Sequence, residues 1–131
     1  MIIDLSYKSS ASACLTNGFG QNLPNLTHLL LNNNQLTKLP DGFGLNLPNL
    51  IVLDLSNNQL TSLPDGFGLV ISNLSKLKTL YLHKNKLTSL PDGFGRVLSN
   101  LPKLEDLYLN NNQLTSLPAG FGQNLLKLRP L

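Results

Sequence analysis

The fold is decided by the stretch Leu50-Ile51-Val52-Leu53-Asp54-Leu55-Ser56-Asn57-Asn58-Gln59-Leu60-Thr61-Ser62-Leu63-Pro64-Asp65-Gly66-Phe67-Gly68. Its pattern recurs further along the chain with the same residue types at the same offsets: Leu77, Leu80, Leu82, Asn85, Leu87, Leu90, Pro91, Gly93, Phe94 and Gly95. Counted by the leucine that heads each copy, the copies begin at Leu26, Leu50, Leu77, Leu104 and Leu128. The copies headed by Leu50 and Leu77 are therefore longer, by three positions, than those headed by Leu26 and Leu104. Self-similarity at a period of roughly 20–50 residues predicts a stack of similar structural units.

The skeleton shared by these copies is L-x-x-L-x-L-x-x-N-x-L-x-x-L-P, which resembles the leucine-rich repeat family. The match covers residues 26–127 in four consecutive copies. The resemblance implies an α/β fold, a leucine-rich-repeat solenoid that coils along a curved, right-handed path. In such a solenoid a parallel β-sheet forms the concave face, and short helices or turns form the convex face.

We expect a single domain over residues 1–131. Its complete repeats are predicted at residues 26–49, 50–76, 77–103 and 104–127, and residues 128–131 begin a further repeat. The boundaries follow directly from the positions of the leucines that head the copies.

Residues 1–25 are expected to form a degenerate first repeat, because Ile3-Asp4-Leu5-Ser6 aligns with Leu53-Asp54-Leu55-Ser56. This copy contains a two-residue insertion, since Leu5 and Phe19 are 14 positions apart whereas Leu55 and Phe67 are 12 apart. Lys8 also stands where the other copies have Asn, which leaves the bonding of the first turn open. Terminal repeats are commonly atypical.

The L-x-L segment of each copy alternates with a period of two, which predicts a short strand with one face in the core. Leu29 and Leu31 then point inward, while Leu30 and Asn32 point to the opposite face. Successive copies should stack these strands in parallel about 4.8 Å apart. The inward residues would form two columns, Leu29, Leu53, Leu80 and Leu107 in one, and Leu31, Leu55, Leu82 and Leu109 in the other.

An asparagine follows each strand where the chain must turn, at Asn34, Asn58, Asn85 and Asn112. A tight coil leaves backbone groups unpaired, and an amide side chain offers both donors and an acceptor. We therefore predict a structural ladder in which these asparagines bond to backbone groups of neighbouring repeats. Such a ladder is usual in the leucine-rich repeat family.

The return leg of each copy carries proline, glycine and phenylalanine in a fixed order. The prolines should end a second extended piece and the glycines should permit the next bend, at Pro40, Pro64, Pro91, Pro118, Gly42, Gly66, Gly93 and Gly120. The phenylalanines are expected to close the core from the convex side, at Phe43, Phe67, Phe94 and Phe121. In the longer copies the helical spacings Phe67-Ile71-Leu74 and Phe94-Leu98-Leu101 predict short helices. The shorter copies have room for little more than a turn.

Composition excludes several other classes of protein. Leucine accounts for 34 of the 131 residues and asparagine for 17, which excludes a generic mixed core. No apolar run approaches the ~18 residues of a membrane span, and Met1-Ile2-Ile3-Asp4 lacks the basic start and the long apolar stretch of a signal peptide. A single thiol, Cys14, excludes an internal disulfide framework, and we interpret it as a small half-buried side chain. The net charge of +3 is modest.

Residues that could carry chemistry are present, but their pattern does not favour a catalytic or metal site. Asp41-Gly42-Phe43-Gly44 and its copies lack the third glycine and the Lys-Ser/Thr of phosphate loops, and are interpreted as turns. His28 and His83 lie two repeats apart with no acid or thiol at metal-ligand spacing, which favours surface or partner contact. The aspartates that recur in the turn after the proline, Asp41, Asp65 and Asp92, are interpreted as turn residues. We expect no enzymatic activity, no cofactor and no metal.

The solvent face of the sheet is where this chain departs from a generic stack of repeats, and solenoids bind their partners on that face. Counted from the heading leucine, the third, fifth, seventh and eighth positions of each repeat are left free by the skeleton. The candidate partner-binding residues at these positions are His28, Leu30, Asn32, Val52, Asp54, Ser56, Thr79, Tyr81, His83, Lys84, Asp106, Tyr108 and Asn110.

Tyr81 and Tyr108 take the fifth position of consecutive repeats, so we expect them to be neighbours in one column, beside Leu30. Exposed aromatic side chains are favoured binding anchors. We therefore predict a partner-binding hot spot at Tyr81, Tyr108 and His83. The alternative is that the two tyrosines only pack along the strand face.

These features favour a non-enzymatic module that binds another protein on its concave face. The resemblance to leucine-rich repeats without disulfide caps or a signal peptide indicates an intracellular or bacterial effector-like protein. Nucleic-acid binding is disfavoured, because basic residues do not cluster with aromatic ones. Residues 125–131 begin a repeat without a polar cap, which predicts self-association through an unpaired edge.

Three alternatives stay open. The chain could be a targeting domain or fragment of a larger enzyme such as a ubiquitin-ligase effector, although the repeats of those proteins are usually shorter and their catalytic cysteine lies downstream. It could recognise glycans or lipids outside the cell, although such relatives usually carry cysteine-rich caps. It could be a consensus-like scaffold, against which the unequal lengths of the repeats count.

Overall fold

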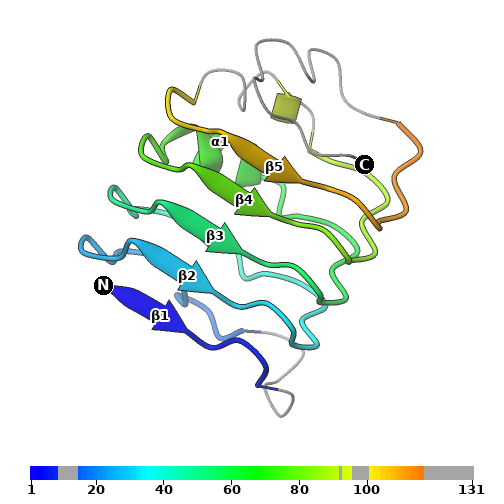
Figure 1. Ribbon diagram of the computed structural model, residues 1–131, viewed down its shortest axis with the longest axis horizontal. Helices are drawn as coiled ribbons and strands as arrows, with labels where there is room; N and C mark the ends of the chain where they lie inside the picture. The colour runs from blue at the N-terminus through cyan, green and yellow to red at the C-terminus, as the bar shows by residue number, and fades with distance from the viewer. Residues whose placement is uncertain (9–14, 92, 96–100, 117–131) are drawn as a thin grey trace.

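Five short strands, one from the degenerate first repeat and one from each of the four complete repeats, form a single sheet in the computed structural model, which describes residues 1–8, 15–91, 93–95 and 101–116. The strands are β1 (Ile2–Asp4), β2 (His28–Leu30), β3 (Val52–Asp54), β4 (Thr79–Tyr81) and β5 (Asp106–Tyr108). All are parallel, in the order β1-β2-β3-β4-β5 (Figure 1). Each strand lies beside the preceding one, so the chain winds as a solenoid of about four turns. The predicted solenoid is confirmed.

Neighbouring strands pair at equivalent positions of the repeat. Leu29 is in register with Leu53, Leu53 with Leu80, and Leu80 with Leu107. In β2, β3, β4 and β5 the central residue is buried and its two neighbours are half-buried. This alternation is that of strands with one face in the core, as the period of two in the sequence predicts.

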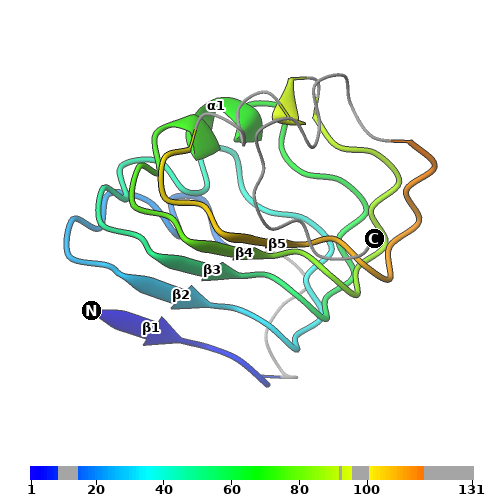
Figure 2. The ribbon, with the colours of Figure 1, turned by 45° about the horizontal axis from the view of Figure 1, so that its top comes forward.

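The core lies between the sheet and the return legs, which run on the opposite side of the solenoid from the strands (Figure 2). The two predicted leucine columns are buried throughout, with every member at most 1% exposed. Phe43, Phe67 and Phe94 close the core from the convex side, and the rings of Phe67 and Phe94 stack with centroids 6.4 Å apart. Burial of each large apolar side chain contributes about 1.5–3 kcal/mol, so stacking of the repeats provides most of the stability.

Asn58 links the turn of its own repeat to the repeat before it. Its Nδ2 donates to the carbonyl oxygens of Leu31, Leu55 and Ser56 at 3.0, 3.1 and 3.1 Å, and its Oδ1 accepts the N–H of Leu36 at 3.1 Å. Bonds of the same kind are made at Asn34, Asn85 and Asn112. These side chains give partners to backbone groups that the tight turn would otherwise leave unpaired.

The first repeat joins the sheet although it departs from the pattern. Ile3 is in register with Leu29, as the sequence alignment of the repeats predicts. Lys8 lacks the amide of the other copies, but its N–H donates to Oδ1 of Asn34 at 2.8 Å. Nδ2 of Asn34 donates in turn to the carbonyl oxygen of Leu5 at 2.9 Å. The second repeat therefore supplies the bonds of the first turn.

The convex side differs between repeats of different length. The repeat that begins at Leu50 contains the helix α1 (Phe67–Ser72), which buries Phe67, Val70 and Ile71 and has Asn73 as its C-cap residue. The shorter repeat before it forms only turns over residues 41–46. Three additional residues in the longer repeat therefore allow one short helix, as the spacing predicts.

Some predictions fall on residues outside the described ranges. The second predicted helix, Phe94-Leu98-Leu101, includes residues 96–100, which lie outside them. The same holds for the predictions made for Cys14, Asp92, Pro118, Gly120, Phe121 and residues 125–131.

Candidate partner-binding face

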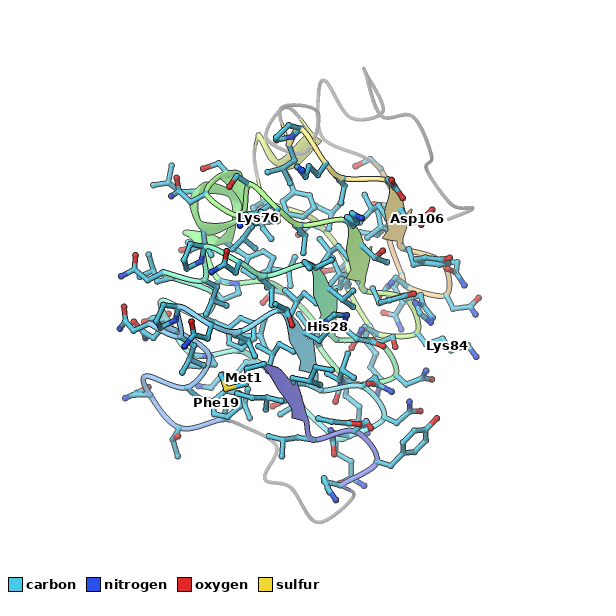
Figure 3. All side chains as sticks on the ribbon, turned by 60° about the vertical axis from the view of Figure 1, so that its left-hand side comes forward. Met1, Phe19, His28, Lys76, Lys84 and Asp106 are labelled. Atoms are coloured by element: carbon cyan, nitrogen blue, oxygen red, sulfur yellow. The ribbon has the colours of Figure 1, made fainter. Side chains whose placement is uncertain are left out.

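The outward side chains of the five strands form one continuous surface, here called the concave face. It consists of Ile2, Asp4, His28, Leu30, Val52, Asp54, Thr79, Tyr81, Asp106 and Tyr108. His28 and Asp106 stand at the first residue of β2 and β5, respectively, and Figure 3 labels both. In β2 to β5 these residues are half-buried, because each is flanked by equivalent residues of the neighbouring strands.

An aromatic cluster spans the third and fourth complete repeats. Tyr81 and Tyr108 are in register across β4 and β5, and their rings stack with centroids 4.8 Å apart and an interplanar angle of 25°. His83 lies against both, with ring centroids 5.8 Å from Tyr81 and 5.5 Å from Tyr108. The parallel register produces this cluster because it sets equivalent positions one strand spacing apart. The structure thus brings together the three residues predicted as a hot spot.

Two residues of the predicted surface, Leu30 and Ser56, are placed differently from the expectation. Leu30 is not beside Tyr81, because β3 lies between β2 and β4 and Asp54 is in register with both residues. Ser56 was expected on the partner-binding surface, but it is only 3% exposed. Its Oγ and its N–H both donate to Oδ1 of Asp54, at 2.6 and 3.0 Å. Ser56 therefore positions a carboxylate of the face and offers little surface of its own.

His83 is held in the neutral form by its surroundings. Its Nδ1 is buried and has no hydrogen-bond partner. Burial lowers the pKa of this imidazole below its ordinary value, since the charged form loses hydration. The carboxylate of Asp54 acts in the opposite direction, and the ammonium group of Lys84 lowers the pKa further. At neutral pH His83 is consequently an uncharged member of the aromatic cluster.

The eighth position of the repeat has a restricted backbone conformation, although its residue type varies between repeats. Asn33, Asn57, Lys84 and Asn111 all adopt positive φ there, between 54° and 61°. Asparagine tolerates the left-handed region better than most residues, which accounts for its recurrence at this position. Lys84 is the exception in residue type, and its side chain is exposed at the rim of the concave face (Figure 3).

The other candidate residues are distributed along the sheet. His28 has a half-buried side chain, and its Nδ1 lies 3.0 Å from Oγ1 of Thr27. His28 and His83 belong to repeats separated by β3 and do not meet, as expected. Half-buried side chains also occur at Val52, Thr79, Asn32 and Asn110.

A second concavity, not expected from the sequence, lies on the convex side. Two grooves of about 450 and 560 Å³ share Leu45, Val70 and Asn73 in their walls. Leu45 lines both grooves and is 42% exposed, and Leu69 lines the larger one and is 75% exposed. The step between a repeat with turns and a repeat with α1 creates these grooves, and the change from a shorter to a longer repeat is the sequence signal for that step.

Within the described ranges, no cluster of three or more histidine, cysteine, aspartate or glutamate side chains could hold a metal ion. Nor does the described part of the chain contain a helix of sufficient length and apolarity to cross a membrane. The concave face itself presents stacked aromatic rings, carboxylates and amides.

Comparison with known families agrees with this architecture. A family model described as leucine rich repeat matches residues 24–70, and a second, described as leucine rich repeats in two copies, matches residues 75–126. The chain belongs to the leucine-rich repeat family. Proteins of this family are typically non-enzymatic and generally bind other proteins.

Among solved structures, the chain is similar to YopM from Yersinia enterocolitica WA-314. The two share 30% sequence identity with a TM-score of 0.53, over 92% of this chain. The chain spans only 27% of the length of that protein. A comparison with curated protein sequences gives no match.

Proposed function

We propose that this chain is a non-enzymatic module that binds another protein on its concave face, with Tyr81, His83 and Tyr108 as the central contact. The observation that carries the proposal is the aromatic cluster, in which residues of two repeats converge at positions that the repeat skeleton does not constrain. Large, rigid aromatic side chains provide contact area at low cost in conformational entropy, and they dominate many protein interfaces.

The remainder of the predicted surface surrounds this cluster. Asp54 is in register with Tyr81, and Asp106 lies two residues before Tyr108 on the same face of β5. Lys84 stands at the rim. A cluster of aromatic residues within a polar rim is the usual anatomy of a protein–protein interface.

The proposal is tested by identifying a partner with the full chain as bait and comparing its affinity for the variant Tyr81→Ala/Tyr108→Ala. We expect the double variant to bind at least tenfold more weakly, as loss of a hot spot implies. Tyr7→Ala is the matched control, because Tyr7 is 74% exposed and lies outside the cluster. A double variant that binds the partner as tightly as the parent would contradict the proposal.

We also propose that this module belongs to a bacterial effector-like protein. The likeness to a protein of the bacterium Yersinia enterocolitica supports it. A translocation assay with the full chain fused to a reporter enzyme tests this part, and retention of the reporter in the producing cell would count against it.

Self-association through the ends of the solenoid stays a prediction, which light scattering at increasing concentration tests.

A further inference from the structure

The concave face has a charge opposite to that of the whole chain. The chain carries ten lysine and arginine residues and seven acidic ones, with a net charge of +3. The ten outward residues of β1 to β5 include three aspartates, Asp4, Asp54 and Asp106, and no lysine or arginine. A surface of one sign on a protein of the other sign attracts partners of complementary charge.

Two of these carboxylates flank the tyrosine pair. Asp54 is the register partner of Tyr81 in the neighbouring strand, which sets the two residues about 4.8 Å apart across the sheet. Asp106 precedes Tyr108 by two residues in β5, so its side chain leaves the same face of the sheet. The aromatic cluster therefore has Asp54 beside it in β3 and Asp106 beside it in β5.

The conformation of Asp54 is fixed by its neighbours. Its Oδ1 accepts the Oγ–H and the N–H of Ser56, at 2.6 and 3.0 Å, and Ser56 is itself buried. A carboxylate held in one position needs little further ordering when it pairs with a cation. The outward residues of β3, β4 and β5 include no lysine or arginine, so the strand face beside Tyr81 carries negative charge and no positive charge of its own.

A tyrosine ring beside a carboxylate is complementary to a guanidinium group. The planar cation stacks on an aromatic ring and donates parallel hydrogen bonds to a carboxylate. Phosphate groups of a nucleic acid or of a lipid headgroup would instead be repelled by Asp54 and Asp106.

We infer that the partner presents an arginine-bearing, positively charged peptide segment to the surface formed by Asp54, Tyr81, Tyr108 and Asp106. This inference rests on the proposed function and names the chemistry of the segment that the same face binds. The guanidinium groups contact the carboxylates and the tyrosine rings, and the remainder of the segment follows the concave face.

The test is the selection of peptides from an unbiased random library displayed on phage, with the full chain immobilised. We expect arginine to be enriched at least threefold over the starting library among the selected peptides. The best synthetic peptide should bind Asp54→Asn/Asp106→Asn at least tenfold more weakly than the parent, and its affinity should fall as salt rises from 50 to 500 mM. Asparagine retains the shape and acceptor oxygen of aspartate, so the loss reports charge.

The control variant is Asp41→Asn/Asp65→Asn, which removes two exposed carboxylates from the convex turns and should bind the peptide within twofold of the parent. Circular dichroism of each variant verifies the fold. Peptides that depend on Tyr81 and Tyr108 but lack arginine enrichment, or that bind Asp54→Asn/Asp106→Asn normally, would overturn this inference and leave the proposed function standing. Selected peptides indifferent to Tyr81→Ala/Tyr108→Ala would overturn both, and a library that yields no binder counts against the inference.

Discussion

Lys84 and Asn57 occupy the same position of consecutive repeats and share a left-handed backbone, with φ of 57° and 54°. For most residues this region costs about 1–2 kcal/mol, and asparagine is among the residues that tolerate it best. The N–H of Lys84 donates to the carbonyl oxygen of Asn110 at 2.9 Å, so the turn conformation is fixed by bonding to the next repeat.

We therefore expect Lys84→Asn to stabilise the protein by about 0.5–1 kcal/mol, because it relieves part of that backbone strain. Urea unfolding measures the change as a higher midpoint at unchanged slope. Lys86→Asn is the matched control, since Lys86 is also exposed but is not among the residues with positive φ. An equal effect of both substitutions would show that lost charge, and not backbone conformation, is responsible.

Removal of one ladder side chain should destabilise the whole stack. Asn58 is 7% exposed and makes three donor bonds and one acceptor bond to backbone groups of two repeats. Asn58→Ala leaves those groups without their partner, which is expected to cost about 1–3 kcal/mol. The neighbouring Gln59→Ala should change stability by less than about 0.5 kcal/mol, because Gln59 is exposed. Thermal unfolding that gives the two variants the same midpoint would contradict the role of the ladder.

The strand and column positions could be predicted from the sequence because the repeat supplies the same evidence four times. A single L-x-L segment does not distinguish a strand from a helix turn, but four segments in register leave one arrangement that buries them all. The burial of Ser56 against Asp54 was not predicted, because this pair of residues occurs only once among the complete repeats. No other complete repeat carries an aspartate two residues before a serine. The available signal was in the first copy, where Ser6 bonds to Asp4 in the same way.

The convex side was less predictable because it depends on contacts between repeats of unequal length. Nothing within the segment around Leu45 indicates a groove, because the groove is lined jointly by the turn at residues 41–46 and by Val70 of α1 in the next repeat. The aromatic cluster of Tyr81, His83 and Tyr108 could be predicted only in part. The register of Tyr81 with Tyr108 follows from the repeat, whereas the approach of His83 to both rings depends on side-chain packing.

Two glycines near α1 should respond in opposite directions to alanine. A Cβ on Gly44, where φ is 92°, would lie 2.7 Å from Cγ1 of Val70. Gly68 lies within α1, and a Cβ there meets no atom within 4 Å. Gly44→Ala should therefore destabilise by about 1–3 kcal/mol through overlap and strain, and Gly68→Ala should stabilise by about 0.5–1 kcal/mol through a less flexible unfolded chain. Urea midpoints of the two variants test this, and a shift of the same sign in both would contradict the packing of the turn against α1.

The burial of His83 predicts a pH dependence of stability on the acid side of neutrality. Because burial lowers the pKa of the folded imidazole below its ordinary value of about 6.5, the unfolded chain binds more protons over the interval between the two pKa values. The free energy of unfolding should be unaffected by this group above that interval and should decrease as pH falls through it. His83→Phe keeps an aromatic ring against Tyr81 and Tyr108 and removes the titration, so its urea midpoint should vary less between pH 7.5 and 5.5. A His83→Phe variant with the same slope as the parent would assign the pH dependence to other groups.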